Sequence, residues 1–512
     1  MKKTCLALLA TLAVSAAAKP PNIIFLFSDD HAFQAISAYG SKINQTPHID
    51  RLAREGVLFN AAYCGNSICG PSRATVLTGK HSNANGFRAN QWGDRFDGSQ
   101  PTLPKYLQAA GYTTGIIGKW HLETDPTGFD EWMIHPAQGD YYNPDFFTAK
   151  GKQRIEGYAT DITVDLSLDF IQRHKGGDKP FLLMCQFKAP HRNWLPLPKY
   201  RERFKGVVFP EPETLFDDYS GRASPAAGHK MGVGADLFPA YDLKLPSDDP
   251  NAVNGTKRMT PAQREAFFAM YKEENDAYLA AQPQGRAKVS WNYQRYLRDY
   301  LACVASVDDN IGRLLAYLDE NGLSENTLVV YSSDQGFYLG EHGWYDKRWM
   351  YEESFRMPLL MRWPAKLKPG TVVDRLVQNI DFAPTLMDAA GLSVPADMHG
   401  VSVLPLLADP KAPWRDSLYY RYYEIGTEHE VPAHRGVRKG PHKLIHYPAT
   451  SEWELFDLAK DPRELRSVAA DPAYAGIRKD LEAELERLRV QYGDNDPLDM
   501  KRKTYGSDQK LK

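Results

Sequence analysis

The chain lacks a surplus of charge of either sign. Its 512 residues carry 62 Lys and Arg against 64 Asp and Glu, a formal net charge of −2 at pH 7. Proteins that bind nucleic acid or an anionic membrane surface through bulk electrostatics usually carry a clear positive excess. We therefore expect no nucleic-acid partner, and an anionic ligand would have to be bound by a local cluster of cations.

Cysteine is also scarce, with five residues in the whole chain. Cys5 lies in the N-terminal apolar stretch, which leaves only Cys64, Cys69, Cys185 and Cys303 for the rest. Four cysteines are too few for a scaffold built on disulfides. Two interpretations of Cys69 stay open at this point: a disulfide to Cys64, or a side chain reserved for chemistry.

Long apolar segments are missing outside the N-terminus. Two lysines at positions 2 and 3 precede an apolar run from Thr4 to Val14, and small residues follow up to Ala18. This order is typical of a cleavable signal peptide. No other stretch approaches the roughly 20 apolar residues that a membrane helix needs. The sequence thus predicts a signal peptide over residues 1–18, no membrane span, and an exported protein that is periplasmic or secreted.

Four short apolar runs recur along the first two thirds of the chain: NIIFLFSDD, TTGIIGKWH, PFLLMCQF and TLVVYSSDQG. Continuous apolar runs of this length are typical of strands that are buried on both faces. Helical patterns lie between them, the clearest running from Tyr300 to Leu318 and ending at Gly322. Alternating strands and helices predict an α/β fold with a large, mostly parallel sheet flanked by helices.

The remaining segments differ in pattern. Residues 204–290 are rich in Pro, Gly and charge, and we expect loops that cover the site, with one short helix near Pro261 to Tyr271. Near residue 395 the pattern changes to three strand-like runs, SLYYRYYEI, HRGVRKGPHKLIHY and WELFDL, before a helix with Leu481, Leu485 and Leu488 on one face. We predict a catalytic domain over residues 19–394 and a smaller C-terminal subdomain, an antiparallel sheet with a packing helix, over residues 395–512.

Each predicted central strand ends in polar residues, and ligands of open α/β sheets bind at this carboxyl edge. The pairs are Asp29 and Asp30, Lys119 and His121, Lys188 and His191, and Asp334 and Gln335. The carboxylate and amide oxygens suit a hard divalent cation such as calcium better than zinc. Solvated turns are the alternative explanation for any single pair, but two oxygen-rich pairs that each end an apolar strand favour a metal site.

The stretch SICGPSRATVLTGK places Cys69 at the start of a predicted helix. Pro71 suits the first turn of a helix, and free backbone N–H groups at that end attract anions. Arg73 adds a fixed cation, and Lys119, His121, His191 and Lys347 also follow or lie in turns. These groups could surround an anionic ligand, although any one of them alone could be a surface residue.

The run CGPSRATVLTG resembles the signature of the type I sulfatases. The segments FLFSDD, GKWH, GFDEW, PFLLMCQFKAPH, DQGFYLGEHG and WELFDLAKDPRE resemble the family in the same order, so the resemblance spans residues 22 to about 465. It implies an alkaline-phosphatase-like fold and hydrolysis of sulfuric esters. It also implies that Cys69 is oxidised to formylglycine by a formylglycine-generating or anaerobic sulfatase-maturating enzyme.

The resemblance further implies a role for each candidate residue. Asp29, Asp30, Asp334, Gln335 and an oxygen of the modified Cys69 would bind Ca²⁺, with Gln335 where many relatives have Asn. The catalytic residues would be Cys69, Arg73, Lys119, His121, His191 and Lys347. A hydroxyl of the hydrated aldehyde would attack sulfur, His191 would protonate the departing oxygen, and His121 would take a proton so that the aldehyde re-forms and sulfate leaves.

The substrate is a sulfated carbohydrate by this resemblance, with a leaning towards the bacterial N-acetylglucosamine-6-sulfatases and hence towards mucin or glycosaminoglycan. Aromatic faces and fixed donors suit sugars and anions, and the candidate contacts are Trp194, Trp344, His434 and Arg435. Two other functions stay open: a phosphodiesterase or phosphonate monoester hydrolase of the same superfamily, and an inactive glycan-binding homologue.

Overall fold

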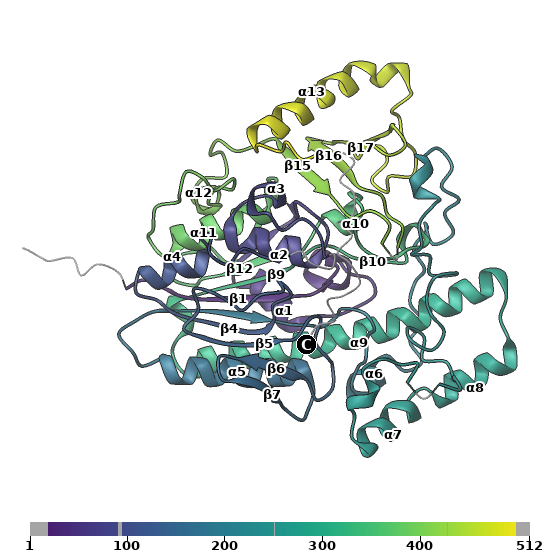
Figure 1. Cartoon of the computed structure of the whole chain (residues 1–512), viewed down its shortest axis with the longest axis horizontal. Helices are drawn as coiled ribbons and strands as arrows, with labels where there is room; N and C mark the ends of the chain where they lie inside the picture. The colour runs from purple at the N-terminus through teal and green to yellow at the C-terminus, as the bar shows by residue number, and fades with distance from the viewer. Residues whose placement is uncertain (1–18, 91–94, 250, 428, 498–512) are drawn as a thin grey trace, which may run out of the picture.

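The computed structural model describes residues 19–90, 95–249, 251–427 and 429–497, so the predicted signal peptide lies outside the described residues. A ten-stranded sheet forms the centre of the molecule, in the order β13-β2-β12-β9-β1-β8-β4-β5-β6-β7 (Figure 1). The neighbours β9, β1, β8 and β4 run parallel to one another. These four strands are the four apolar runs that the sequence predicts, and their position in the middle of the sheet explains why both faces are apolar.

The strands of this sheet have the following bounds: β1 Asn22–Ser28, β2 Val57–Phe59, β4 Thr113–Lys119, β5 Glu131–His135, β6 Asp145–Thr148, β7 Gly151–Arg154, β8 Phe181–Gln186, β9 Thr327–Ser333, β12 Leu359–Arg362 and β13 Thr371–Val373. β12 runs antiparallel to β9 and β2, and β6 runs antiparallel to β5 and β7. The sheet is therefore mixed but mostly parallel, as predicted. Two small pairs lie apart from it, β3 Ala62–Tyr63 with β14 Val377–Gln378, and β10 Tyr338–Leu339 with β11 Tyr345–Asp346.

Helices cover both faces of the sheet (Figure 1). On one face α1 Pro47–Arg54 and α5 Ala159–His174 pack against α9 Gly285–Glu320. On the other, α2 Cys69–Thr78 and α4 Leu103–Ala109 pack against α11 Phe382–Ala389. The other helices before the C-terminal region are α3 Ser82–Asn85, α6 Pro198–Arg201, α7 Pro261–Ala269, α8 Lys272–Ala281, α10 Glu352–Phe355 and α12 Leu404–Ala408.

Helix α9 corrects one expectation. It ends as predicted, just before Gly322, whose φ of 65° suits a residue without a side chain. It begins at Gly285, however, and two helices, α7 and α8, precede it. Helix α7 is the short helix that the sequence predicts near Pro261 to Tyr271. The expectation of loops is therefore wrong only over α8 and the start of α9, because a helix on the surface can carry many charged residues and still bury one face.

The C-terminal region forms a four-stranded antiparallel sheet, with β15 Ser417–Tyr422, β16 His434–Lys439, β17 His442–Tyr447 and β18 Glu452–Asp457. The sequence predicts three strands here, and the second run divides into β16 and β17 at a turn that contains Gly440, where φ is 55°. Helix α13 Ala475–Gln491 packs on this sheet through Leu481, Leu485 and Leu488, as predicted. The domain boundary at residue 394 stays a prediction.

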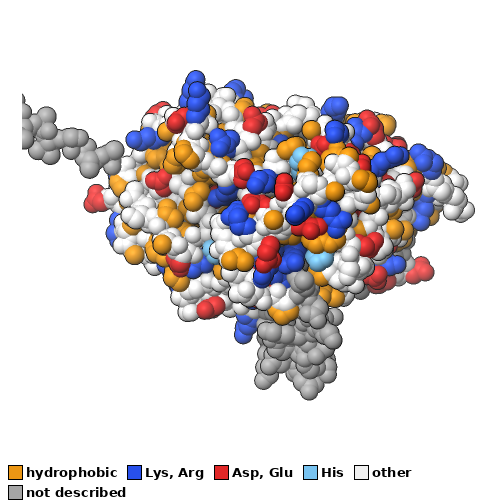
Figure 2. Space-filling model, turned by 90° about the horizontal axis from the view of Figure 1, so that it is seen from above, with side chains coloured by type: hydrophobic (Ala, Val, Ile, Leu, Met, Phe, Trp, Pro, Cys, Tyr) orange, Lys and Arg blue, Asp and Glu red, His pale blue; other side chains and the backbone are white. Residues whose placement is uncertain are grey.

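No helix of the described residues is long and apolar enough to cross a membrane. On the face in Figure 2, lysine and arginine side chains alternate with aspartate and glutamate, so neither sign dominates it. This mixture agrees with the nearly balanced composition.

Gly118 in β4 is the glycine on which the carboxyl edge of the sheet most directly depends. Its φ is +105°, and a Cβ placed there would lie 1.9 Å from the carbonyl oxygen of Gln186. We predict that Gly118→Ala lowers the free energy of unfolding in urea by at least about 2 kcal/mol, because backbone strain and a steric clash add together.

Gly111→Ala is the matched control, because Gly111 has a similar φ of +90° but no heavy atom within 4 Å of its missing Cβ. Gly111→Ala should lower the free energy of unfolding only by the cost of backbone strain, about 1 kcal/mol. Equal losses in the two variants would contradict the role of close packing at Gly118.

Candidate functional site

The site lies at the carboxyl edge of the four central strands. Asp29 and Asp30 follow β1, Asp334 follows β9, and Lys119 is the last residue of β4. Ser28 pairs in register with Ser333, so the residues that follow these two strands emerge side by side. The parallel arrangement thus brings together residues that lie about 300 positions apart, as the strand ends predict.

Three carboxyl groups form the centre of the site. Oxygen atoms of Asp29, Asp30 and Asp334 lie within 4.8 Å of one another, and all three side chains are fully buried. The backbone N–H of Asp30 donates to Oδ1 of Asp334 at 3.1 Å, and the side-chain amide of Gln335 donates to Oδ1 of Asp30. Burial raises the pKa of Asp30 to about 8 and that of Asp334 to about 6, and the neighbouring carboxylate of Asp29 contributes to both shifts.

This carboxyl cluster fits a divalent cation. Oδ1 of Asp29 and Oε1 of Gln335 are buried and have no hydrogen-bond partner among the described residues. Buried oxygen atoms without a partner are costly, and two of them beside three carboxylates form the all-oxygen donor set that Ca²⁺ prefers. Of the predicted ligands, Asp29, Asp30, Asp334 and Gln335 are therefore all in place to hold a metal ion.

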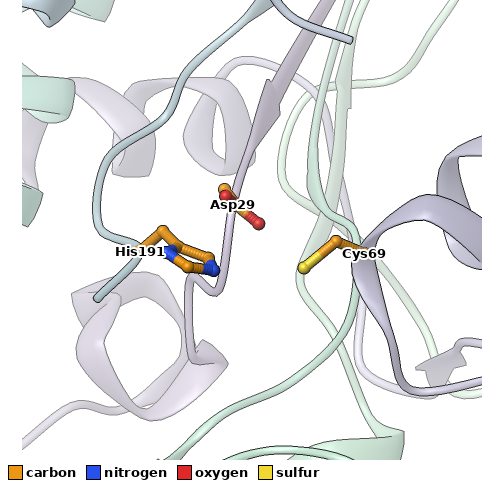
Figure 3. Close-up of side chains that lie close together, drawn as sticks. All are labelled: Asp29, Cys69 and His191. Atoms are coloured by element: carbon orange, nitrogen blue, oxygen red, sulfur yellow. The ribbon is translucent and has the colours of Figure 1, made fainter. Parts of the chain in front are cut away.

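Cys69 faces this cluster from the first residue of α2. Its Sγ, a carboxylate oxygen of Asp29 and a ring nitrogen of His191 lie within 4.8 Å of one another, and Figure 3 shows the three side chains directed towards a common centre. Gly70 permits the close approach of the helix, since a Cβ there would lie 2.4 Å from the ring of Phe87. The prediction that Cys69 lies at the start of a helix is confirmed.

The unmodified thiol of Cys69 is a poor nucleophile in this position. Burial raises its pKa well above the ordinary value, and the negative charge of Asp29 adds to the effect. All four described cysteines are free, and Sγ of Cys64 lies 3.2 Å from Oγ of Ser67. The alternative of a disulfide between Cys64 and Cys69 is therefore wrong for this structure.

Three cations neutralise the carboxylates. Nη2 of Arg73 donates to Oδ2 of Asp334 at 3.0 Å, and Lys119 forms a short ion pair with Asp29. Nζ of Lys347 lies 2.6 and 2.7 Å from the two oxygens of Asp30. Burial would raise the pKa of Asp29, but the charges of Lys119, Arg73 and Lys347 outweigh it and hold this pKa well below its usual range.

The two histidines are held neutral at the rim of the cluster. Nδ1 of His191 lies 2.6 Å from the carbonyl oxygen of Arg192, so this nitrogen carries the proton and Nε2 faces Asp30 at 3.7 Å. The hydroxyl of Tyr141 donates to the carbonyl oxygen of His191 at 2.6 Å. Burial lowers the pKa of His121 and of His191 well below the ordinary value.

Several residues at the site carry no signal in the sequence. Gln138 accepts from Nζ of Lys119 at 2.6 Å, and Oε1 of Gln186 accepts from Arg73 at 2.9 Å. Lys188 differs from them, because it follows a predicted strand; it is buried and lies over the ring of Tyr141. An isolated glutamine in a turn or strand is too common to be singled out without the fold.

Three of the four predicted substrate contacts are buried, and their role in binding stays a prediction. Trp194 and Trp344 are fully buried and pack against the aromatic rings of Tyr296 and Tyr351 respectively, which leaves no indole surface for a ligand. His434 is 2% exposed and lies among aromatic rings, stacked on that of Trp349. Arg435 remains half-buried, and its role stays a prediction.

Comparison with known proteins places these features in a family. A model described as Sulfatase matches residues 21–392, and one described as N-sulphoglucosamine sulphohydrolase, C-terminal, matches residues 340–491. The chain is 45% identical to an N-acetylglucosamine-6-O-sulfatase of Bacteroides thetaiotaomicron, over 99% of this chain and 94% of that one.

Solved structures agree with these matches. One with 45% identity and a TM-score of 0.91, which covers 94% of this chain and 100% of the other, holds its substrate D-glucosamine-2-N,6-O-disulfate. A phosphonate monoester hydrolase from Silicibacter pomeroyi has a TM-score of 0.68 at 23% identity, covering 93% of this chain and 96% of that one. At that identity the second likeness concerns the fold alone.

We predict that Ca²⁺ raises the free energy of unfolding by about 2.7 kcal/mol at 100 times its dissociation constant, because the ion binds the folded carboxyl cluster and not the unfolded chain. The measurement is urea unfolding of the EDTA-treated protein with and without added Ca²⁺. Asp29→Asn should remove most of this gain. Asp169→Asn, which alters an exposed pair with Arg173 within α5, is the matched control and should keep it.

Proposed function

The chain belongs to the sulfatase family and has its alkaline-phosphatase-like fold, and from this premise we propose that it removes the 6-O-sulfate of N-acetylglucosamine or glucosamine residues in a sulfated glycan. The chain is a sulfuric ester hydrolase by its family. The observation that carries the substrate is the 45% identity over 99% of the chain to an N-acetylglucosamine-6-O-sulfatase. Mucin and glycosaminoglycan both contain such residues, and either could be the source.

We propose that Cys69 is oxidised to formylglycine and that Asp29, Asp30, Asp334, Gln335 and the modified side chain hold Ca²⁺. The family typically uses formylglycine and a divalent metal. The hydrated aldehyde would supply a hydroxyl nucleophile at position 69, and Ca²⁺ would supply positive charge for the oxygen atoms that gather there. The protonated, buried thiol supports this modification, because the thiol itself would react slowly.

The protein's own cations would bind the sulfate and orient it. Lys119 and Lys347 already lie against Asp29 and Asp30, so their ammonium groups can also donate to sulfate oxygens in the same cavity. Arg73 is held by Asp334 and Gln186 and would keep the start of α2 in place. These fixed donors favour a tetrahedral anion over a neutral ligand.

His191 would supply the proton that the departing sugar oxygen needs. Its Nδ1 proton is fixed on the carbonyl oxygen of Arg192, so Nε2 is the atom that faces the site and is bare in the neutral ring. His191 would therefore take up a proton from solvent at Nε2 before it passes that proton to the sugar oxygen. His121 would act at the hydroxyl groups of position 69. Both roles need the precise ring orientations that their hydrogen bonds provide.

The buried position of Cys69 and the N-terminal segment bear on when the enzyme is matured and where it acts. Cys69 is 1% exposed in the folded chain, so the formylglycine-generating or anaerobic sulfatase-maturating enzyme would act before folding is complete. We also propose that the protein is exported to the periplasm or the exterior, on the strength of residues 1–18.

A phosphodiesterase or phosphonate monoester hydrolase is the second candidate, because a phosphonate monoester hydrolase shares the fold. The fold does not separate the two chemistries. The identity of 45% to a sulfatase against 23% to the phosphonate hydrolase favours sulfate esters. An inactive glycan-binding homologue is disfavoured, since the six predicted catalytic side chains are all present.

We predict that Cys69→Ala lowers the rate of sulfate release at least about 10⁴-fold, because it removes the nucleophile. The variant and the wild type are both produced together with the maturation enzyme. The wild-type peptide that contains Cys69 should show the mass of an aldehyde in place of a thiol. Cys64→Ala is the matched control, because Cys64 is equally buried on the same segment but lies outside the carboxyl cluster. Full activity in Cys69→Ala would overturn the mechanism.

We predict that N-acetylglucosamine-6-sulfate is hydrolysed with a kcat/KM at least about tenfold above that of its 3-sulfate and its 6-phosphate, a difference of about 1.4 kcal/mol. Ion chromatography of released sulfate and phosphate measures all three with one enzyme preparation. Faster release from the phosphate would favour the second candidate, and faster release from the 3-sulfate would retain the sulfatase but contradict the 6-position.

A further inference from the structure

One amide side chain, that of Gln138, joins two of the catalytic residues proposed above. Gln138 lies in the turn that follows β5 and is half-buried. Its Oε1 is 2.6 Å from Nζ of Lys119, and its Nε2 is 3.3 Å from Nε2 of His121. Lys119 ends β4 and His121 lies two residues beyond it, so a single side chain from the turn after the neighbouring strand contacts both.

The chemistry of Lys119 decides which way the amide faces. An ammonium group can only donate, so it must meet the oxygen of Gln138 and the amide NH₂ must face His121. The amide N–H then donates to Nε2 of His121, which must contribute its lone pair. The neutral imidazole therefore carries its proton on Nδ1, a buried atom with no hydrogen-bond partner among the described residues.

The charges around His121 reinforce this neutral form. Lys119, Arg73 and Lys347 all disfavour an imidazolium, while Asp29 alone favours one. A protonated Nε2 would also point its hydrogen at the amide NH₂ of Gln138. Proton uptake at Nε2 can therefore occur only after Gln138 has turned away.

We propose that Gln138 is a positioning residue, which aims Lys119 at Asp29 and holds His121 as a neutral imidazole with its proton on Nδ1. The inference rests on the proposed function, since it assigns the support of two residues in that mechanism. Gln138 acts through Lys119 and His121 and needs no contact with the substrate. The Nδ1–H of His121 is then a donor that has no partner among the described residues.

The first test is Gln138→Ala in the fully matured enzyme. We expect kcat for a 6-O-sulfated N-acetylglucosamine to fall about 10- to 100-fold, with KM changed less than about threefold, because both side chains lose their orientation while the binding cations remain. Gln108→Ala is the matched control. Its amide bonds to Asp130 at 2.7 Å, at the other end of β4, and its activity should equal that of the wild type.

The second test is the pH dependence of kcat/KM in Gln138→Glu, which has nearly the same shape. A carboxylate still accepts from Lys119, but it would also accept from a protonated Nε2 and so stabilise the imidazolium of His121. The pKa of His121 therefore rises in Gln138→Glu, so that, as the pH falls, the neutral imidazole becomes protonated at a higher pH than in the wild type. The acidic limb of the kcat/KM profile should move to higher pH by at least about one pH unit.

The outcomes separate this inference from the proposed function. Unchanged kcat in Gln138→Ala, or a Gln138→Glu profile that superimposes on that of the wild type, overturns the positioning role while sulfatase activity stands. A third outcome is that Gln138→Ala lowers both kcat and the free energy of unfolding in urea, while the pH profile of Gln138→Glu does not shift. Gln138 then has a structural role, and the positioning role is overturned. Failure of the wild-type protein to release sulfate would instead overturn the proposed function.

Discussion

Three carboxyl groups buried within 4.8 Å of one another are the constraint on which the site depends. Such a cluster is strongly destabilising unless positive charge enters the same space. Lys119, Arg73 and Lys347 each approach one of the three acids, yet the pKa of Asp30 remains raised to about 8. Burial is the main cause of this shift, and a divalent cation beside Asp30 would favour its charged form and so offset it.

The scaffold makes this crowding possible by bringing backbones unusually close. Gly118 lets β4 approach β8 just before Lys119, and Gly70 lets the start of α2 approach the ring of Phe87 just after Cys69. Either position with a side chain would push a reactive group away from the carboxylates. The residues that perform the chemistry thus depend on neighbouring residues that have no side chain at all.

The sequence predicts the central part of this arrangement because each piece of it is local. Apolar runs identify β1, β4, β8 and β9, and parallel strands place their polar ends together, so Asp29, Asp334 and Lys119 could be assigned without a structure. Exposure is not a local property, and the burial of Trp194 and Trp344 could not be predicted because an aromatic side chain near a turn can face either solvent or the core. Gln138 was missed for the related reason that its meaning comes only from its two neighbours in space.

The C-terminal sheet is part of the support of the site and not an appendage. Lys347 lies in a segment whose backbone is held from the other side, where the hydroxyl of Tyr420 in β15 donates to the carbonyl oxygen of Arg348 at 2.6 Å. Arg348 in turn pairs with Glu424 at 2.6 Å, and Glu424 accepts from the backbone N–H of Asn90, whose own side chain accepts from Gly70. A continuous path of buried and partly buried hydrogen bonds therefore runs from the residue after Lys347 through the C-terminal region back to the residue after Cys69. Because a shift at any point along this path would move either the cation or the nucleophile, the two regions have to be kept together for the site to exist.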